Sequence, residues 1–158
     1  MSIEVRGLAE LCRKLAKLGG DADSALENGT REAARWVNDA AKELCPVDTG
    51  QLRASLHTDY KREGGKHIGA VKTNVEYAPY VEFGTGPAGD GTYPYPISGL
   101  SYKSDPWLGN IPGVGPRMIR GQRAQPFLYP ALIDNREAVL GCYERAIQKE
   151  INNKVAGK

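Results

Sequence analysis

Residues 24–46 read SALENGTREAARWVNDAAKELCP, and this stretch carries the strongest regular pattern in the chain. Its apolar positions recur at the spacing of one helical face, at Leu26, Ala33, Val37, Ala40 and Leu44. Ser24 followed by Glu27 has the form of a capping box, and Pro46 cannot continue a helix. The pattern therefore predicts a long helix that begins near Ser24 and ends at Pro46.

Two further helices are predicted, one on each side of the long one. Before the long helix, four leucines recur at the spacing of one helical face: Leu8, Leu11, Leu15 and Leu18. Gly19-Gly20 follows them and is expected to end this helix. After Pro126 the helical rhythm returns, with Asp134 as the expected N-cap and Glu137 three residues on. The expected apolar face of this last helix is Val139, Tyr143, Ala146 and Ile147. Small alanines in the long helix leave room for a sheet or another helix to approach it closely.

Between the helices, residues 55–76 alternate β-branched and aromatic residues with polar ones, and residues 63–66 read EGGK, a turn signal. This pattern predicts a β-hairpin with one face in water. The expected fold class is α+β: a small antiparallel sheet packed against a long N-terminal helix and a C-terminal helix. A length of 158 residues suits one domain with a real core.

Residues 84–126 are unusual, because they hold nine of the 19 glycines and seven of the 10 prolines. No regular helix is expected there, and we predict a long projecting arm at about residues 86–124, inserted into the single domain 1–158. Ordering so many residues costs roughly 1 kcal/mol or more of backbone entropy for each of them. The arm should therefore have its own hairpin and a neighbouring subunit to pack on. Its candidate interface residues are Tyr93, Tyr95, Tyr102, Trp107, Arg117, Arg120 and Arg123.

Composition excludes several classes of protein. The formal net charge of +2 argues against a surface that binds nucleic acid everywhere, and no run approaches the roughly 18 apolar residues of a membrane span. Three scattered cysteines and two histidines without ligand spacing indicate buried thiols and no metal site. Residues 84–89 satisfy the letters G-x-G-x-x-G, but the prolines in and after them exclude the helix that a dinucleotide site needs. We therefore expect a protein without cofactor, metal or membrane anchor.

One enzyme hypothesis and one binding hypothesis remain as alternatives. Residues 48–50, Asp48-Thr49-Gly50, spell the triplet of aspartic proteases, which would make the chain a small homodimeric protease. The purely structural interpretation is that the triplet forms a local turn. Asp48 or Thr49 then accepts hydrogen bonds from nearby backbone amides, and Gly50 supplies an unusual dihedral angle. The other alternative is a nucleic-acid-binding protein that uses the arginines of the arm.

Three segments in order, residues 45–56 (CPVDTGQLRASL), 77–86 (YAPYVEFGTG) and 124–132 (AQPFLYPAL), resemble the gene-product-ten-like family of tail-component or neck proteins of long-tailed bacteriophages and prophages. The positions that carry the resemblance are Pro46, Asp48, Thr49, Gly50, Leu52, Ser55, Tyr77, Ala78, Tyr80, Glu82, Gly84, Thr85, Ala124, Pro126, Phe127, Pro130 and Ala131. The resemblance covers about residues 5–155. The main departure is the length of residues 87–123, where contacts cannot be transferred from the family.

The resemblance implies a structural virion protein of the phage neck, without enzymatic activity, that connects head and tail or completes the tail. Such proteins work as rings, with sixfold or twelvefold symmetry implied by the portal and tail that they join. The implied partners are head-completion or connector proteins on one side and the tail tube or tail terminator on the other. Packaged DNA is a further candidate partner of the ring. The expected location is the neck or tail of the virion, after assembly in the host cytoplasm.

The residues of the three segments also have a physical interpretation. Pro79 suits the first turn of a short helix that carries Tyr80 and Phe83. Glu82 stands among aromatic neighbours as a candidate buried carboxylate, with Arg53 as one candidate partner. Phe127, directly after Pro126, is expected to fill the core where the last helix begins.

Overall fold

The structure is a computed structural model that describes residues 8–17, 21–111 and 113–156. Its first half contains α1 (Leu8–Lys17), α2 (Ala22–Leu44), α3 (Gln51–Ser55), β1 (His57–Glu63), β2 (Lys66–Lys72), α4 (Ala78–Phe83) and α5 (Gly86–Gly89). The second half contains β3 (Trp107–Ile111), β4 (Gly115–Ile119), α6 (Leu128–Ile133) and α7 (Arg136–Ala156). Long helices and two small antiparallel sheets confirm the α+β class.

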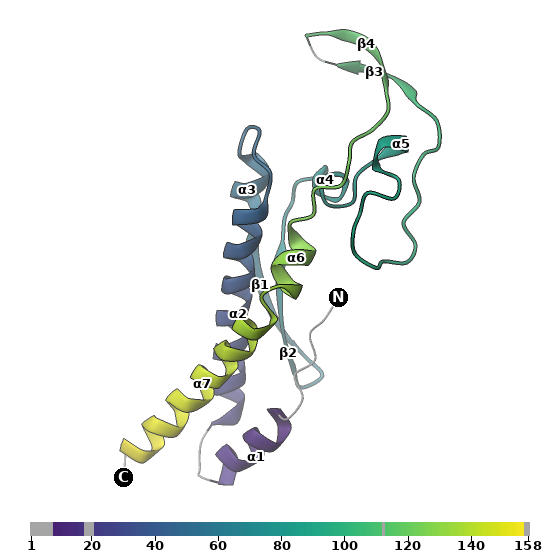
Figure 1. Cartoon of the computed structure of the whole chain (residues 1–158). Coiled ribbons are helices and arrows are strands. Elements are labelled where there is room, and N and C mark those ends of the chain that lie inside the picture. Colours follow the sequence, from purple (N-terminus) through teal and green to yellow (C-terminus); the bar gives the residue numbers. More distant parts are fainter. Residues whose placement is uncertain (1–7, 18–20, 112, 157–158) are drawn as a thin grey trace.

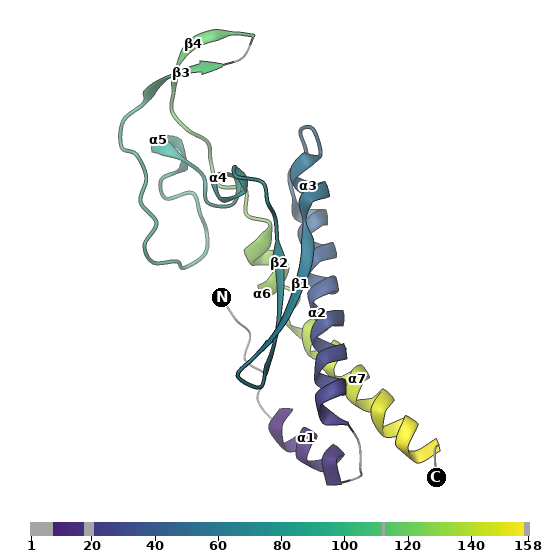
Figure 2. The same cartoon turned by 180° about the vertical axis from the view of Figure 1, so that it is seen from behind.

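The long helix α2 lies at the centre of the body, between α7 on one side and the β1–β2 hairpin on the other (Figures 1 and 2). Small residues allow both approaches. A Cβ atom added at Gly29 would lie 2.8 Å from the Tyr143 ring on α7, and one at Gly69 would lie 3.1 Å from the Ala34 side chain. The expectation that small residues on this helix admit close neighbours is therefore confirmed.

The start of α2 differs from the prediction. The helix begins at Ala22, and the Asp21 carboxylate accepts a hydrogen bond from the Ser24 amide at 2.9 Å. Ser24 is thus the residue being capped, since an Asp side chain three positions earlier reaches its free N–H. The end is as predicted, because Cys45 turns into extended backbone before Pro46. Leu44 was wrongly placed on the buried face, which at this turn runs through Ala41 and Cys45 instead.

The predicted hairpin at residues 55–76 is confirmed. Strands β1 and β2 pair antiparallel, and the Glu63↔Lys66 pair closes the turn. The helix α1 agrees with the first predicted helix, whereas Leu18 and the Gly19-Gly20 stop lie outside the described residues.

The C-terminal segment forms two helices, α6 and α7, instead of the single predicted one. Asp134 has helical backbone angles and ends α6, so its prediction as the N-cap of the last helix is wrong. An N-cap needs non-helical backbone angles, and α7 begins only at Arg136. Between them, the Asn135 side chain donates to the Ala131 carbonyl at 3.0 Å and accepts from the Trp36 indole at 3.2 Å, which holds the corner against α2.

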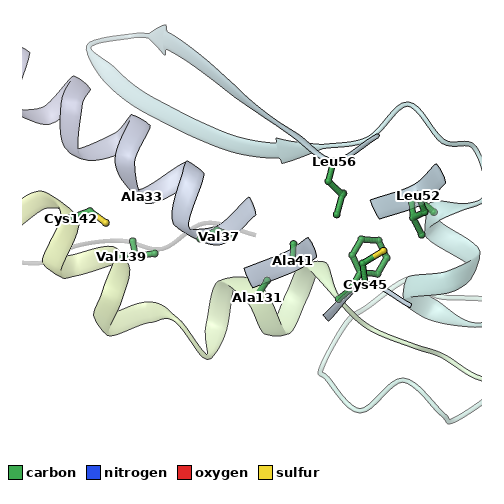
Figure 3. Packing of buried hydrophobic residues seen from close by; sticks show 11 residues of the cluster. Ala33, Val37, Ala41, Cys45, Leu52, Leu56, Ala131, Val139 and Cys142 are labelled. Carbon is green, nitrogen blue, oxygen red and sulfur yellow. The ribbon is translucent and has the colours of Figure 1, made fainter. Parts of the chain in front are cut away.

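The core lies where α2, α3, α6 and α7 meet (Figure 3). Its buried residues are Ala33, Val37, Ala41, Cys45, Leu52, Leu56, Ala78, Phe127, Ala131, Val139 and Cys142. Phe127 is the largest fully buried side chain, with 0% of its surface exposed, which confirms its predicted place in the core. Burying one such side chain contributes about 1.5–3 kcal/mol.

The glycine- and proline-rich segment contains one helical turn, α5, and the β3–β4 hairpin. The expectation of no regular helix in this segment is therefore wrong at residues 86–89, where Pro87 occupies the first turn, a position that its missing N–H tolerates. The β3–β4 hairpin lies at the end of the molecule farthest from α1 (Figures 1 and 2). Among the described residues, no helix is long and apolar enough to cross a membrane.

Candidate functional site

A groove of about 890 Å³ lies where the α2–α3 turn, α4 and the base of the β3–β4 hairpin meet. It is lined by Pro46, Val47, Asp48, Thr49, Gly50, Leu52, Tyr77, Tyr80, Val81, Gly84, Thr85, Gly86, Ser101, Tyr102, Lys103, Trp107, Gln122 and Gln125. Residues of the first two family-like segments thus share one surface, although residues 57–76 separate them in the sequence. We call this surface the groove.

The α2–α3 turn forms one wall of the groove. Gly50 has a positive φ of 81°, which a residue with a side chain rarely adopts, and it directly precedes α3. The Thr49 hydroxyl accepts from the Gln51 amide at 3.4 Å, and the Asp48 carboxylate is exposed. These contacts agree with the structural interpretation of residues 48–50 as a local turn. Leu52 is buried and connects the turn to the core.

Ser55 lies behind the groove and ties α3 to the sheet. Its hydroxyl hydrogen-bonds the Leu52 carbonyl at 2.7 Å and the Thr73 hydroxyl at 2.6 Å. Arg53 donates to the Cys45 carbonyl at 3.0 Å, at the end of α2. These polar contacts hold the wall of the groove at a fixed angle to α2.

The helix α4 forms the opposite wall. As predicted, its first turn contains Pro79, and it ends at Gly84, which has a positive φ of 79°. A Cβ atom at Gly84 would lie 2.7 Å from the Ala124 amide nitrogen, so only glycine lets the two segments approach this closely. Thr85 then pairs with Gln122 in an isolated antiparallel bridge, which fixes the base of the hairpin.

Glu82 points away from the groove and into the body, where only 3% of its surface is exposed. One carboxylate oxygen accepts from the Phe127 and Leu128 amides at 2.7 and 2.9 Å, and the other accepts from the Tyr129 amide at 3.1 Å. The first amides of a helix lack partners within it, and α6 therefore begins on a side chain from α4. The second and third family-like segments are joined by these bonds.

The proposed pairing of Glu82 with Arg53 is wrong. Arg53 bonds the Cys45 carbonyl, and Glu82 obtains its hydrogen bonds from backbone amides and from the Tyr93 hydroxyl at 3.4 Å. A helix start supplies several donors at once without the cost of burying a second charge. Phe127 was expected in the core, but no local pattern in the sequence connects the backbone amides after Pro126 with Glu82.

Tyrosines of the glycine- and proline-rich segment gather beside Glu82. Tyr93 contacts Phe83 edge-on with ring centroids 5.1 Å apart, and Tyr95 lies 4.4 Å from Tyr129 between ring centroids. Burial, followed by the charge of Glu82, raises the pKa of the Tyr93 hydroxyl above its usual range. Tyr93 and Tyr95 are thus partly covered by their own chain and shield the buried carboxylate.

The other two aromatic residues of this segment line the groove. The Tyr102 hydroxyl donates to the Phe83 carbonyl at 2.9 Å, and Lys103 stands over the Trp107 ring at 5.1 Å. Arg117, Arg120 and Arg123 are exposed and lie on or just after β4, outside the lining of the groove. Sequence analysis missed the lining residues Val47, Gln122 and Gln125, because no local pattern distinguishes them from other loop residues.

The residues of the third family-like segment support the groove from behind. Pro126 precedes the buried Phe127, and Pro130 is buried in α6. In the described part of the chain, no cluster of three or more His, Cys, Asp or Glu residues could hold a metal ion. Burial raises the pKa of the Cys45 and Cys142 thiols, which suits inert core residues, as expected for these two cysteines.

Comparison with known proteins gives one match. Residues 9–84 match the family model described as "Bacteriophage HK97-gp10, putative tail-component". The match ends at Gly84, so it contains the first family-like segment and most of the second, and it confirms the gp10-like resemblance over these residues. The family indicates a phage tail component, whose place is the virion. No curated protein and no solved structure matches the chain.

Proposed function

We propose that this gp10-like chain is a structural protein of the phage neck, which assembles as a ring between head-completion proteins and the tail. The observation that carries the proposal is the groove. The family match ends at Gly84, and residues from its two characteristic segments, Pro46 to Leu52 and Tyr77 to Gly84, line the same surface. The third segment supports that surface through Glu82.

The chemistry of the groove supports binding to protein. Tyr77, Tyr80 and Val47 are exposed there, and aromatic and aliphatic side chains of this kind are typical of the centre of protein interfaces. The rigid supports behind them, Gly84 against Ala124 and Glu82 on the start of α6, keep the surface preorganised for a partner. Preorganisation lowers the entropy lost on binding, which suits weak contacts repeated around a ring.

The proposal is tested by asking where the protein is found and what it binds. In purified virions of the phage or induced prophage that encodes it, mass spectrometry should detect the chain in a fixed ratio to the tail-tube protein. Light scattering should show a ring-sized mass for the purified chain, alone or after mixing with the products of neighbouring genes. Virions that lack the chain would contradict the proposal.

The same preparation addresses the protease alternative. A small aspartic protease would cleave peptides and would lose that activity in a folded Asp48→Asn variant, whereas a structural protein should show no cleavage to lose. If the wild type hydrolyses peptides and the Asp48→Asn variant does not, the neck proposal is wrong and the chain is an enzyme.

A further inference from the structure

The β3–β4 hairpin has one covered and one uncovered face. Leu108 and Met118 are directly opposite each other in the pairing, on the same face, and are 70% and 64% exposed. On the other face, Ile119 covers Gly109 and Trp107 packs beside Gly86. Val114, at the turn, is also exposed. The hairpin therefore presents an apolar face that nothing in its own chain covers.

A two-stranded hairpin on its own is only marginally stable in water, and exposed apolar patches mark interaction sites. Pro116 lies in β4 and has no amide hydrogen, which is typical of an edge strand that does not pair further. The partner is thus expected to cover the Leu108 and Met118 face with side chains, instead of adding a strand to the hairpin.

The charge of the hairpin indicates what kind of partner this is. Residues 107–123 hold three arginines and no acidic residue. Arg117, Arg120 and Arg123 form no ion pair within the described part of the chain. A complementary surface should therefore combine exposed apolar groups with carboxylates. Nucleic acid would satisfy the arginines but would leave Leu108 and Met118 uncovered.

The groove of the same protein combines exposed apolar side chains with carboxylates. Val47 and Tyr80 are 54% and 58% exposed in its lining, and Asp48 lies between its apolar groups. Glu43 lies in the last turn of α2, four residues before Val47 in the sequence, and Glu76 directly precedes Tyr77. In the described residues none of these three carboxylates has an ion-pair partner. The basic lining residue, Lys103, comes from the hairpin side and stands over Trp107.

We propose that the β3–β4 hairpin of one copy docks in the groove of a second copy, with Leu108 and Met118 on Val47 and Tyr80. Arg120 and Arg123, which follow β4, then lie beside the carboxylates, whereas Arg117 is opposite Gly109 on the other face of the hairpin. Donor and acceptor are different surfaces of one chain, so the contact is head-to-tail, and head-to-tail contacts generate rings or filaments. The contact rests on the proposed function, because it is the way in which a ring of this protein would close.

Two complementary variants test the contact. The hairpin variant combines Leu108→Asp with Arg120→Glu, and the groove variant combines Val47→Arg with Asp48→Arg; all four side chains are exposed. Each variant alone should self-associate at least about tenfold more weakly than the wild type in analytical ultracentrifugation. Mixed together, they should form a 1:1 heterodimer and nothing larger, because one intact hairpin and one intact groove remain. Lys149→Glu, an exposed charge reversal on α7, is the matched control and should associate like the wild type.

Several outcomes would overturn the contact. These are a wild type that stays monomeric at about 100 μM, a mixture of the variants that forms no heterodimer, or variants that associate normally. Substitution of the arginines could instead weaken binding to duplex DNA and leave self-association unchanged. That result would identify nucleic acid as the partner of the hairpin. Circular dichroism and urea unfolding check that each variant is folded, and Arg120→Glu alone is a second, milder hairpin variant. If one of these outcomes is found and the chain is nevertheless present in purified virions, only the hairpin contact is refuted. The proposed role in the neck is then unaffected.

Discussion

The two hairpins of this protein are built alike and are supported differently. Both are two-stranded and antiparallel, but β1–β2 lies along α2, with Gly69 against Thr30 and with His67 and Arg62 both on Asp23 at the start of that helix. On the β3–β4 hairpin, Ile119 covers Gly109 and Trp107 packs beside Gly86 on one face, while Leu108 and Met118 are exposed on the other. A hairpin of this size becomes stable by packing on something else. The first hairpin finds its support within the chain, and the second is left to a partner.

The largest difference between the two regions should come from the core beneath the first hairpin. Phe127→Ala is expected to lower the free energy of unfolding by about 3–5 kcal/mol, because it empties a fully buried site. Leu108→Ala, on the second hairpin, is the control and should change it by less than about 0.5 kcal/mol in the monomer. Urea unfolding followed by circular dichroism measures both values. Equal losses would mean that the hairpin face is already covered in the monomer.

The connection between the two regions is Glu82. Glu82→Gln should lower the free energy of unfolding by about 1–3 kcal/mol, because an amide NH₂ cannot accept the hydrogen bonds that one carboxylate oxygen accepts at the start of α6. Glu76→Gln, a change at an exposed carboxylate, serves as the control. Hydrogen exchange should also become faster at the Phe127, Leu128 and Tyr129 amides. Unchanged exchange at these amides would show that Glu82 does not hold the start of α6.

A pair of strand glycines compares the supported and the unsupported hairpin directly. Gly69→Val should lower the free energy of unfolding by about 1–3 kcal/mol, because its side chain would meet the Thr30 backbone carbonyl and the Ala34 side chain. Gly109→Val would meet the flexible Ile119 side chain, with the Trp107 indole nitrogen at an ordinary contact distance, and should cost less than about 0.5 kcal/mol. Thermal unfolding of the two variants measures the difference. Similar losses would contradict the view that only β1–β2 packs on a fixed surface.

The smallest effect is expected at the exposed pair Asp59–Lys72 in the first hairpin. The Lys72 ammonium hydrogen-bonds the Asp59 carboxyl and lowers its pKa below the usual 3.8. Because the folded pKa is the lower one, the pair contributes stability above the pKa of the unfolded chain and loses it as the pH falls through the folded pKa. An NMR titration of the Asp59 carboxyl carbon should give a midpoint below 3.8 that rises in Lys72→Gln. An unchanged midpoint in that variant would exclude Lys72 as the cause.

Many residues of the candidate site could be predicted from the sequence, but their arrangement around one groove could not. The segments around Asp48 and Tyr80 stand out in the sequence because turn residues and aromatics cluster at fixed spacing, and the groove brings both together. Glu82 stood out as a buried carboxylate, but its partners could not be predicted. Backbone amides at a helix start carry no sequence signature, and α6 is 45 residues away. The break between α6 and α7 was missed for a similar reason, since Asn135 makes it with contacts to Trp36 and Ala131.

Sequence alone determined the local elements of this protein: the long helix that ends before Pro46, the hairpin that turns at Gly64-Gly65, and the short helix between Pro79 and Gly84. These follow from periodicity, turn chemistry and proline geometry, which act over a few residues. Only the tertiary structure decided that Glu82 starts α6, that two distant segments share one groove, and that Leu108 and Met118 stay exposed. Each of these depends on which surfaces meet after the helices pack, and burial between distant residues is not written in any local pattern.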